Sequence, residues 1–200
     1  MALHRLAALR QQPFPMAARP QALPAPSHLG RTLWLTGLSG AGKSALAQRL
    51  VPMLRRDGLA ACMVDGDQLR HGLSRDLGFR EADRAESVRR AAELACLLNQ
   101  QGIYAVVALI SPLAAHREAA RRIVGEAGYL EVYIKTPLDV CEQRDPKGLY
   151  ARARRGEIAE FTGISSAYEA PLDPALAIDT QVMDIQDCCR LILDRVRRHP

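Results

Sequence analysis

The first group of residues that could do chemistry is a glycine-rich run that ends in lysine and serine. Residues 37–44 fit the pattern G-x-x-x-x-G-K-[ST], which is typical of a loop that binds the phosphates of a nucleoside triphosphate. The glycines let the backbone curl until its N–H groups face phosphate oxygens, and a following helix adds the partial positive charge of its N-terminus. A turn between strand and helix without a ligand is the alternative interpretation. The residues expected to bind ATP here are Gly37, Leu38, Ser39, Gly40, Ala41, Gly42, Lys43 and Ser44.

Within this run, Lys43 and Ser44 carry the functional side chains. The Lys43 ammonium can reach the β- and γ-phosphates, and the Ser44 hydroxyl can bind Mg²⁺. The pattern alone does not separate kinases from GTPases and motor ATPases. The sequence has no N-K-x-D run of the kind that reads guanine, and its 200 residues favour a small-molecule kinase over a motor.

Two carboxylates, Asp65 and Asp67, follow the second predicted strand. In a parallel sheet the carboxyl ends of the strands open into the ligand crevice. One carboxylate there can hold Mg²⁺ through water, and the other can accept the proton of an attacking hydroxyl. A solvated Asp-Gly-Asp turn is the alternative, because these residue types favour turns. We expect Asp65, Asp67 and Lys43 to be catalytic, with Ser44 and Asp65 as metal ligands.

Several arginines and one aromatic residue come next, among them Arg70, Phe79 and Arg84. Arginine forks hold phosphate or sulfate oxygens through paired hydrogen bonds, so they fit an anionic acceptor. Exposure or pairing with neighbouring acids also explains arginines on a helix. Phe79 lies among these charges, where its ring either stacks on a nucleobase or packs in the core.

Alternating strands and helices must position these residues. Short apolar runs predict buried strands at 32–36, 59–64, 103–110, 130–134 and 175–178. Apolar spacing near 3.6 residues predicts helices at 45–56, 81–101, 112–125, from about 137, and at 183–197. We expect Pro52 to kink the first helix. The alternation indicates an α/β fold of three layers, P-loop NTPase-like, in which helices cover both faces of a mainly parallel sheet.

Composition limits the other classes of function. A chain of 200 residues with 48% hydrophobic residues suits one domain. Its longest apolar run, 103–110, is far shorter than the ~20 residues of a membrane span. A net charge of +5 is too mild to indicate nucleic acid as the partner. Five cysteines without C-x-x-C spacing favour neither a disulfide framework nor a zinc site, so we expect a cytoplasmic protein.

Residues 1–30 differ from the rest of the chain. They contain no acidic residue and many prolines, which disfavour both helix and sheet. We therefore predict a flexible leader at 1–30, followed by one domain at 31–200. An organelle-targeting segment is the alternative interpretation of the leader.

Longer motifs add information that isolated residues cannot. Residues 65–86 contain Asp-Gly-Asp-Gln-Leu-Arg-His-Gly-Leu, Asp-Leu-Gly-Phe and Asp-Arg-Ala-Glu, and residues 141–150 read Cys-Glu-Gln-Arg-Asp-Pro-Lys-Gly-Leu-Tyr. Shorter motifs are Ile110-Ser111-Pro112, Glu131-Val132-Tyr133, Gly156-Glu157-Ile158, Phe161-Thr162-Gly163-Ile164 and Tyr168-Glu169-Ala170-Pro171. In this order they closely resemble the adenylyl-sulfate kinase family, from about residue 28 to residue 180.

This resemblance implies transfer of the ATP γ-phosphate to the 3′-hydroxyl of adenosine 5′-phosphosulfate (APS), giving 3′-phosphoadenylyl sulfate in sulfate assimilation. ATP and Mg²⁺ are the implied cofactors. A separate ATP sulfurylase would supply APS, and a homodimer is the implied assembly. Two alternatives stay open: a degenerate relative that binds nucleotides as a sensor or partner subunit, and a kinase of another small hydroxyl substrate.

The resemblance also implies roles for individual residues. Residues 145–163 match a lid that closes over both nucleotides, with Lys147 near the phosphates and Arg144 beside the ATP adenine. Ser111 matches a serine that is phosphorylated in the family; we expect it at the catalytic site, with the phosphate passing directly between the two nucleotides. Arg70 and Arg84 match residues that bind the phosphosulfate, and Phe79 and Phe161 match a pair that sandwiches the acceptor adenine. The full set implied to bind the acceptor is Arg70, Phe79, Arg84, Ser87, Ile110, Lys147 and Phe161.

Three differences from the family pattern involve four positions. Ser87 stands where asparagine is usual, Leu113-Ala114 replaces Tyr-Arg, and Ala45 replaces a threonine. The first two changes remove polar, aromatic and cationic groups near the acceptor. We therefore predict an active enzyme with a raised KM for the acceptor.

Overall fold

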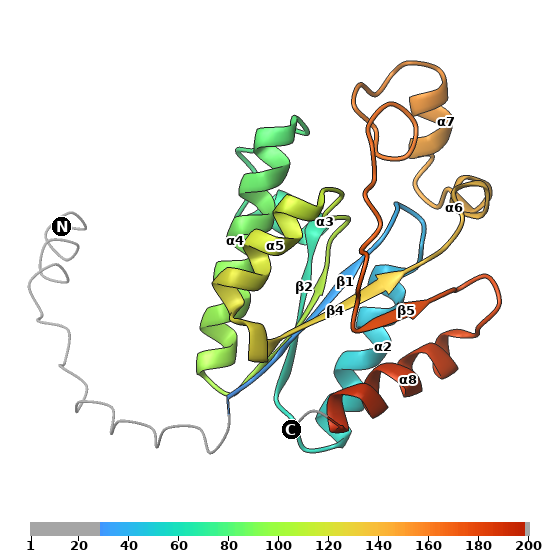
Figure 1. Cartoon of the computed structure of the whole chain (residues 1–200). Helices are drawn as coiled ribbons and strands as arrows, with labels where there is room; N and C mark the ends of the chain where they lie inside the picture. Colours follow the sequence, from blue (N-terminus) through green and yellow to red (C-terminus); the bar gives the residue numbers. More distant parts are fainter. Residues whose placement is uncertain (1–28, 199–200) are drawn as a thin grey trace, which may run out of the picture.

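A computed structural model describes residues 29–198, which build a parallel sheet with helices on both sides (Figure 1). The five strands lie in the order β2-β3-β1-β4-β5, and every neighbouring pair is parallel. The strands are β1 (Thr32–Thr36), β2 (Ala61–Asp65), β3 (Tyr104–Ala108), β4 (Tyr129–Ile134) and β5 (Leu176–Ile178). The predicted α/β fold is confirmed.

Helices form the outer layers. In Figure 1, α4 and α5 cover one face of the sheet, and α2 and α8 cover the other. The helices are α2 (Lys43–Arg56), α3 (Gly66–His71), α4 (Glu81–Gln100), α5 (Ala114–Val124), α6 (Leu138–Arg144), α7 (Leu149–Arg154) and α8 (Ile185–Arg197), with a 3₁₀ turn η1 at Glu126–Gly128.

The two faces of the sheet bury two separate apolar clusters, because successive side chains of a strand point to opposite faces. In β1, Leu33 and Leu35 join the cluster that contains Ile192 of α8. Trp34 lies between them in sequence and joins the cluster that contains Ala92 of α4. All three β1 side chains are fully buried, as expected of a central strand covered on both sides.

The order of the strands places a topological switch point beside β1. The chain passes from β1 to the edge strand β2, returns through β3, and then continues to β4 and β5 on the other side of β1. Ala108 of β3 is in register with both Asp65 of β2 and Leu35 of β1. The loops that follow these strands therefore start level with each other, at the switch point where such sheets bind ligands.

Two short helices, α3 and α7, were not predicted from apolar spacing, and an aspartate stabilises the start of each. The Asp65 carboxylate accepts hydrogen bonds from the N–H groups of Asp67 (2.9 Å) and Gln68 (3.4 Å). The Asp145 carboxylate accepts from the N–H groups of Tyr150 (3.1 Å) and Ala151 (3.0 Å). Side-chain acceptors of this kind satisfy the free N–H groups of a first helical turn.

The ends of the predicted elements shift by a few residues. Helix α2 begins at Lys43, directly from the phosphate loop, and Pro52 does not interrupt it. Strand β3 ends at Ala108, two residues before the predicted end. Helix α4 ends at Gln100, one residue before the predicted end, and Gly102 beyond its cap has a φ of +74°, which suits the left-handed position after a helix.

The predicted leader lies mostly outside the described residues, which begin at 29. Its last residue, Gly30, is buried, and its N–H donates to the Asn99 carbonyl (2.8 Å). A Cβ at Gly30 would collide with the Ile103 carbonyl. Within residues 29–198, no helix is long and apolar enough to cross a membrane.

Candidate active site

The glycine-rich loop between β1 and α2 closes around the Lys43 side chain. Its ammonium donates hydrogen bonds to the carbonyl oxygens of Gly37 (2.8 Å) and Leu38 (2.6 Å). Burial lowers the pKa of Lys43 from 10.5 to about 8, although nearby Asp65 and Asp67 act in the opposite direction. Anionic phosphate oxygens would compensate the buried charge better than neutral carbonyls do, so this position suits a polyphosphate.

Two glycines of the loop lie where a side chain could not fit. Gly37 has a φ of +149°, and a Cβ there would come within 2.6 Å of the Ile134 carbonyl oxygen. Gly40 has a φ of +75°, and its Cβ would lie 2.9 Å from the Cys141 carbonyl oxygen. The loop thus packs tightly against the end of β4 and against α6, which fixes its curvature.

Residues from distant parts of the chain hold the loop in place. The hydroxyls of Thr136 and Thr180 lie 3.2 and 3.0 Å from the Ala41 carbonyl oxygen, to which they donate. Arg144 donates to the hydroxyl (2.9 Å) and the carbonyl (2.8 Å) of Thr180. The Tyr150 hydroxyl donates to another loop carbonyl, that of Ser39 (3.0 Å). Sequence reasoning missed both threonines, and no pattern near the loop indicates them.

Ser44 and Asp65, the predicted metal ligands, are in direct contact. The Ser44 hydroxyl donates to the Asp65 carboxylate at 2.6 Å. Asp65 is 6% exposed, and the same carboxylate caps α3. It is therefore not the solvated turn residue of the alternative interpretation.

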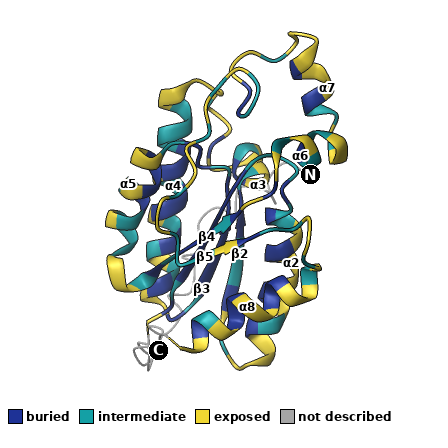
Figure 2. Ribbon diagram, turned by 45° about the vertical axis from the view of Figure 1, so that its right-hand side comes forward, coloured by how far each residue is buried: buried dark blue, intermediate teal, exposed yellow. Residues whose placement is uncertain are grey.

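Asp67 and Lys147, the second predicted carboxylate and the predicted lid lysine, form an ion pair. Asp67 lies in the first turn of α3, and Lys147 lies between α6 and α7. Both side chains are more than half exposed. The contact joins the lid segment to α3, which directly follows β2. Figure 2 shows α6 and α7 beyond the ends of the strands.

A second cationic group consists of Arg70 and Arg84, which both contact Phe79. The Arg70 guanidinium carbon lies 4.2 Å from the centroid of the Phe79 ring. Arg84 donates to the Phe79 carbonyl (2.6 Å) and contacts the Glu160 carbonyl and the Thr162 hydroxyl of the lid. Burial lowers the pKa of both arginines. By contrast, Arg90, which lies on α4 like Arg84, forms an ion pair with Asp76 at 2.6 Å. This agrees with the alternative interpretation, in which such arginines pair with neighbouring acids.

The two predicted stacking rings have different surroundings. Phe79 is 59% exposed, whereas Phe161 is 9% exposed and belongs to the apolar cluster under α2 and α8. The Phe161 ring packs edge-on against Tyr150, with 4.9 Å between centroids. In this structure Phe161 also anchors the lid to the core.

Ser111 follows β3 and lies against Trp34. The Trp34 indole N–H donates to the Ser111 hydroxyl at 3.0 Å, and Ser111 is 2% exposed. The Ile110 carbonyl beside it accepts from the Thr36 hydroxyl at 2.7 Å. Ser87, on the inner side of α4, is 4% exposed.

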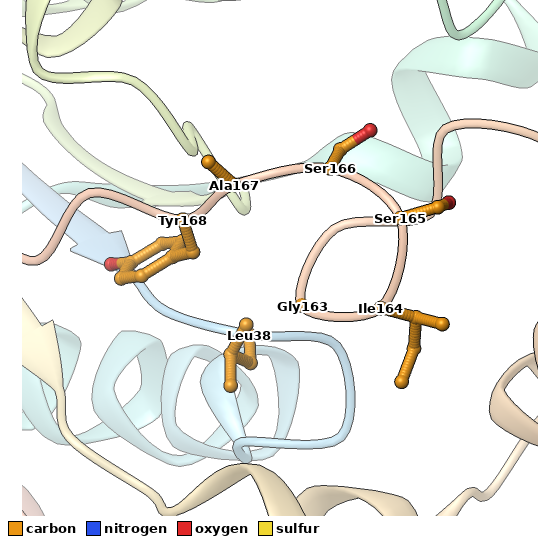
Figure 3. A pocket seen from close by; sticks show the side chains of 7 residues that line it. All are labelled: Leu38, Gly163, Ile164, Ser165, Ser166, Ala167 and Tyr168. Atoms are coloured by element: carbon orange, nitrogen blue, oxygen red, sulfur yellow. The ribbon is translucent and has the colours of Figure 1, made fainter.

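An open pocket of about 470 Å³ separates the phosphate loop from the segment that follows the lid. Figure 3 shows Leu38 on one side and residues 163–168 on the other. Tyr168 lines it, stacks on Tyr133 with 6.0 Å between centroids, and shares a hydrogen bond with Thr36 (3.0 Å). Ser165 and Ser166 also line the pocket, and sequence reasoning missed them.

Taken together, the groups at this end of the sheet suit a reaction between two anionic ligands. Lys43 and the loop N–H groups can hold one polyanion, and Arg70 and Arg84 can hold another. Asp67 lies on the side of the arginines, where a carboxylate can accept a proton from a hydroxyl. Positioning and electrostatic stabilisation of this kind are what phosphoryl transfer requires.

Comparison with known proteins agrees with this chemistry. A family model described as "Adenylylsulphate kinase" matches residues 29–179. An adenylyl-sulfate kinase of Paraburkholderia xenovorans is 56% identical over 79% of this chain and 88% of its own, and one of Shewanella amazonensis is 51% identical over 84% of each. The Mycobacterium tuberculosis APS kinase CysC, in complex with AMPPNP and APS, is 47% identical with a TM-score of 0.82, over 85% of this chain and 99% of its own. The fold, the phosphate loop and these relatives show that the chain belongs to the adenylyl-sulfate kinase family.

Proposed function

We infer that this chain is an adenylyl-sulfate kinase, which transfers the γ-phosphate of ATP to the 3′-hydroxyl of APS. The family match over residues 29–179 carries this conclusion. The phosphate loop, with Lys43 inside it and Ser44 hydrogen-bonded to Asp65, supports the use of ATP. The M. tuberculosis relative is in complex with AMPPNP and APS. Two nucleotides bound at once allow direct transfer between them.

Ser44 and Asp65 are our proposed ligands for Mg²⁺. A hydroxyl and a carboxylate 2.6 Å apart are a suitable donor pair for an ion that takes its remaining ligands from phosphates and water. Bound there, Mg²⁺ would neutralise charge on the β- and γ-phosphate oxygens. Lys43 would act on the same oxygens from inside the loop.

Asp67 is the proposed acceptor of the proton from the 3′-hydroxyl. Its pairing with Lys147 orients the carboxylate toward the lid. When ATP binds, Lys147 can turn to the phosphates, which leaves Asp67 free for the acceptor. Ser111 is engaged by Trp34, which supports a positioning role and direct transfer rather than a phosphoserine step.

On the acceptor side, we propose that Arg70 and Arg84 bind the phosphosulfate and that Phe79 stacks on the adenine. The exposed Phe79 ring is available for stacking. The lid contacts of Arg84 would be exchanged for contacts with the anion. Closure of residues 145–163 would then exclude water, which competes for the γ-phosphate.

The biological setting follows from the chemistry of the substrate. APS must come from an enzyme that adenylylates sulfate, so we propose an ATP sulfurylase upstream. We also propose a cytoplasmic location and a homodimer, the latter testable by light scattering of the full chain. The two alternative functions predict no turnover despite binding, or turnover with another hydroxyl substrate.

The decisive experiment is ADP release by the purified chain with MgATP, with and without APS, beside Lys43→Ala. We expect release that depends on APS and that Lys43→Ala abolishes. Binding of both nucleotides without turnover would favour the sensor. Turnover with a nucleoside monophosphate, shikimate or gluconate in competition assays would favour a different acceptor.

A further inference from the structure

One buried side chain, Arg117 of α5, holds the turn that carries Ser111. Ser111 has a φ of +45°, a conformation that non-glycine residues rarely adopt and that surrounding contacts must stabilise. The Arg117 guanidinium donates to the carbonyl oxygens of Ser111 (2.9 Å) and Pro112 (3.3 Å). These bonds fix the two peptide groups that directly follow the left-handed residue.

Arg117 itself is fixed from the opposite side by Glu131 of β4. The Arg117 Nε lies 3.0 Å from a carboxylate oxygen of Glu131, and both side chains are less than 10% exposed. Burial raises the pKa of Glu131, and Arg117 opposes that shift. The Tyr168 ring, 5.9 Å from the guanidinium, covers the pair. A buried ion pair adds little net stability to a fold, because the cost of removing both charges from water offsets their attraction. We therefore expect the Arg117–Glu131 pair to have a role other than stabilising the fold.

The place of this turn in the sheet suggests that role. Ala108, three residues before Ser111, is in register with Asp65 on one side and with Leu35, just before the phosphate loop, on the other. The Ser111 turn therefore lies between the proposed metal ligand and the loop. An error of about 1 Å in such a position can reduce a rate a hundredfold.

We propose that Arg117 is a positioning residue for phosphoryl transfer, which acts by holding the Ser111 turn in its left-handed conformation. The proposal rests on the proposed function of the site. Arg117 does not touch the reacting groups; Glu131 sets its orientation, and its guanidinium sets the position of Ser111. Arg117 belongs to none of the motifs of the phosphate loop or of the acceptor side.

The test removes both charges of the pair, because Arg117→Met alone would leave the buried Glu131 with only the more distant Arg121, at 3.5 Å, as a partner. We expect the double variant Arg117→Met/Glu131→Gln to keep a Tm and an ATP affinity close to wild type. Its kcat with APS should fall roughly 10- to 100-fold. The matched control is Arg121→Met, one turn later on α5. Arg121 lies 3.5 Å from the same carboxylate and otherwise contacts Glu118, Glu126 and the Tyr129 ring, but not the Ser111 turn. The kcat of Arg121→Met should therefore stay within about twofold of wild type.

A second readout does not depend on turnover. Trp34 is the single tryptophan of the chain, and its indole N–H donates to Ser111, so its indole N–H resonance reports the position of that hydroxyl. The double variant should shift this resonance in the direction produced by Ser111→Ala. Glu131→Gln alone, which keeps the guanidinium over both carbonyls, should leave it nearly unchanged.

Two results would overturn the proposal. One is an unchanged indole resonance together with an unchanged kcat in the double variant. The other is a parallel fall of Tm, ATP affinity and kcat, which would mean that the pair only stabilises the fold. A wild-type chain without APS-dependent turnover would instead refute the proposed function, and the indole resonance would still decide whether Arg117 positions Ser111.

Discussion

The Ser44 hydroxyl donates a 2.6 Å hydrogen bond to the Asp65 carboxylate, which connects the helix after the phosphate loop to the end of β2. The same carboxylate accepts the N–H groups of Asp67 and Gln68 at the start of α3. Asp65 therefore has a structural function and a proposed metal-binding function at once. A variant that separates the two functions is the most informative one.

Asp65→Asn should separate them. Asparagine caps a helix about as well as aspartate, so the free energy of unfolding should fall by less than ~1 kcal/mol. The loss of charge should weaken Mg²⁺ binding and lower kcat by about a hundredfold or more. Mg²⁺ titrations of the ADP-release rate measure this. The control is Asp184→Asn, which alters the equivalent cap of α8 (2.7 and 2.9 Å); an equal loss of activity there would refute the metal role of Asp65.

The lowered pKa of Lys43 predicts how ATP binding depends on pH. The free enzyme binds ATP best with Lys43 protonated, and its pKa there is about 8. Bound phosphates should raise that pKa, so the Kd for ATP should be nearly flat below pH 8 and rise about tenfold per pH unit above it. Calorimetry from pH 7 to 9.5 tests this, and a flat profile would contradict the prediction.

The same shift predicts a stability effect of the opposite kind. Because the pKa of Lys43 is lower in the folded state than its ordinary 10.5, the unfolded chain binds more protons between pH 8 and 10.5. The contribution of Lys43 to the free energy of unfolding therefore rises with pH in that window. Lys43→Met should be more stable than wild type at pH 7, with a difference that shrinks as the pH rises from 8 toward 10.5.

Lys147→Ala should separate catalysis from stability in the lid. Lys147 pairs with Asp67, but both side chains are more than half exposed, so the free energy of unfolding should change by less than ~1 kcal/mol. The rate with saturating ATP and APS should fall roughly 10- to 100-fold, because a cation at the phosphates is lost. Arg154→Ala, which breaks the exposed Arg154–Glu142 pair of α7, is the control. Comparable rates for the two variants would exclude a special role of Lys147.

Phe79 and Phe161 should respond differently to truncation. Phe79→Ala removes an exposed ring, so Tm should hardly change, while loss of base stacking should raise the KM for APS by roughly 5- to 100-fold. Phe161→Ala removes a buried ring that packs on Tyr150 and should cost about 3–5 kcal/mol of unfolding free energy. Phe161→Leu keeps the apolar volume for kinetic comparison. An unchanged KM in Phe79→Ala would refute stacking on that ring.

The departures from the family pattern predict a raised KM for APS in the wild-type chain. The variant Ser87→Asn/Leu113→Tyr/Ala114→Arg should therefore have a lower KM. Ser87 is buried, whereas Ala114 is exposed, so Leu113→Tyr/Ala114→Arg is the version less able to disturb packing. Steady-state kinetics at saturating ATP give the KM for APS of the wild-type chain and of both variants. A wild-type KM as low as that of the variants would contradict the prediction.

Features that depend on neighbouring residues could be predicted from the sequence alone. The phosphate loop is one such feature, because its glycines, Lys43 and Ser44 are consecutive and their conformational needs are local. The strands of the sheet are another, since β1 matches its apolar run residue by residue. The order of the motifs was enough to identify the family. Helices α3 and α7 could not be predicted from apolar spacing, because each has only six residues, too few for a helical period to show.

Only the tertiary structure decided the contacts between residues that are far apart in the chain. Thr180 reaches the Ala41 carbonyl across 139 positions, and Trp34 reaches Ser111 across 77. The burial of Phe161 and the pairing of Arg117 with Glu131 are of the same kind. Strand register and helix packing set such contacts, and these arise from the whole core rather than from any local pattern. The sequence therefore determined which chemistry the chain can perform, and the fold determined which side chains hold the reacting groups in place.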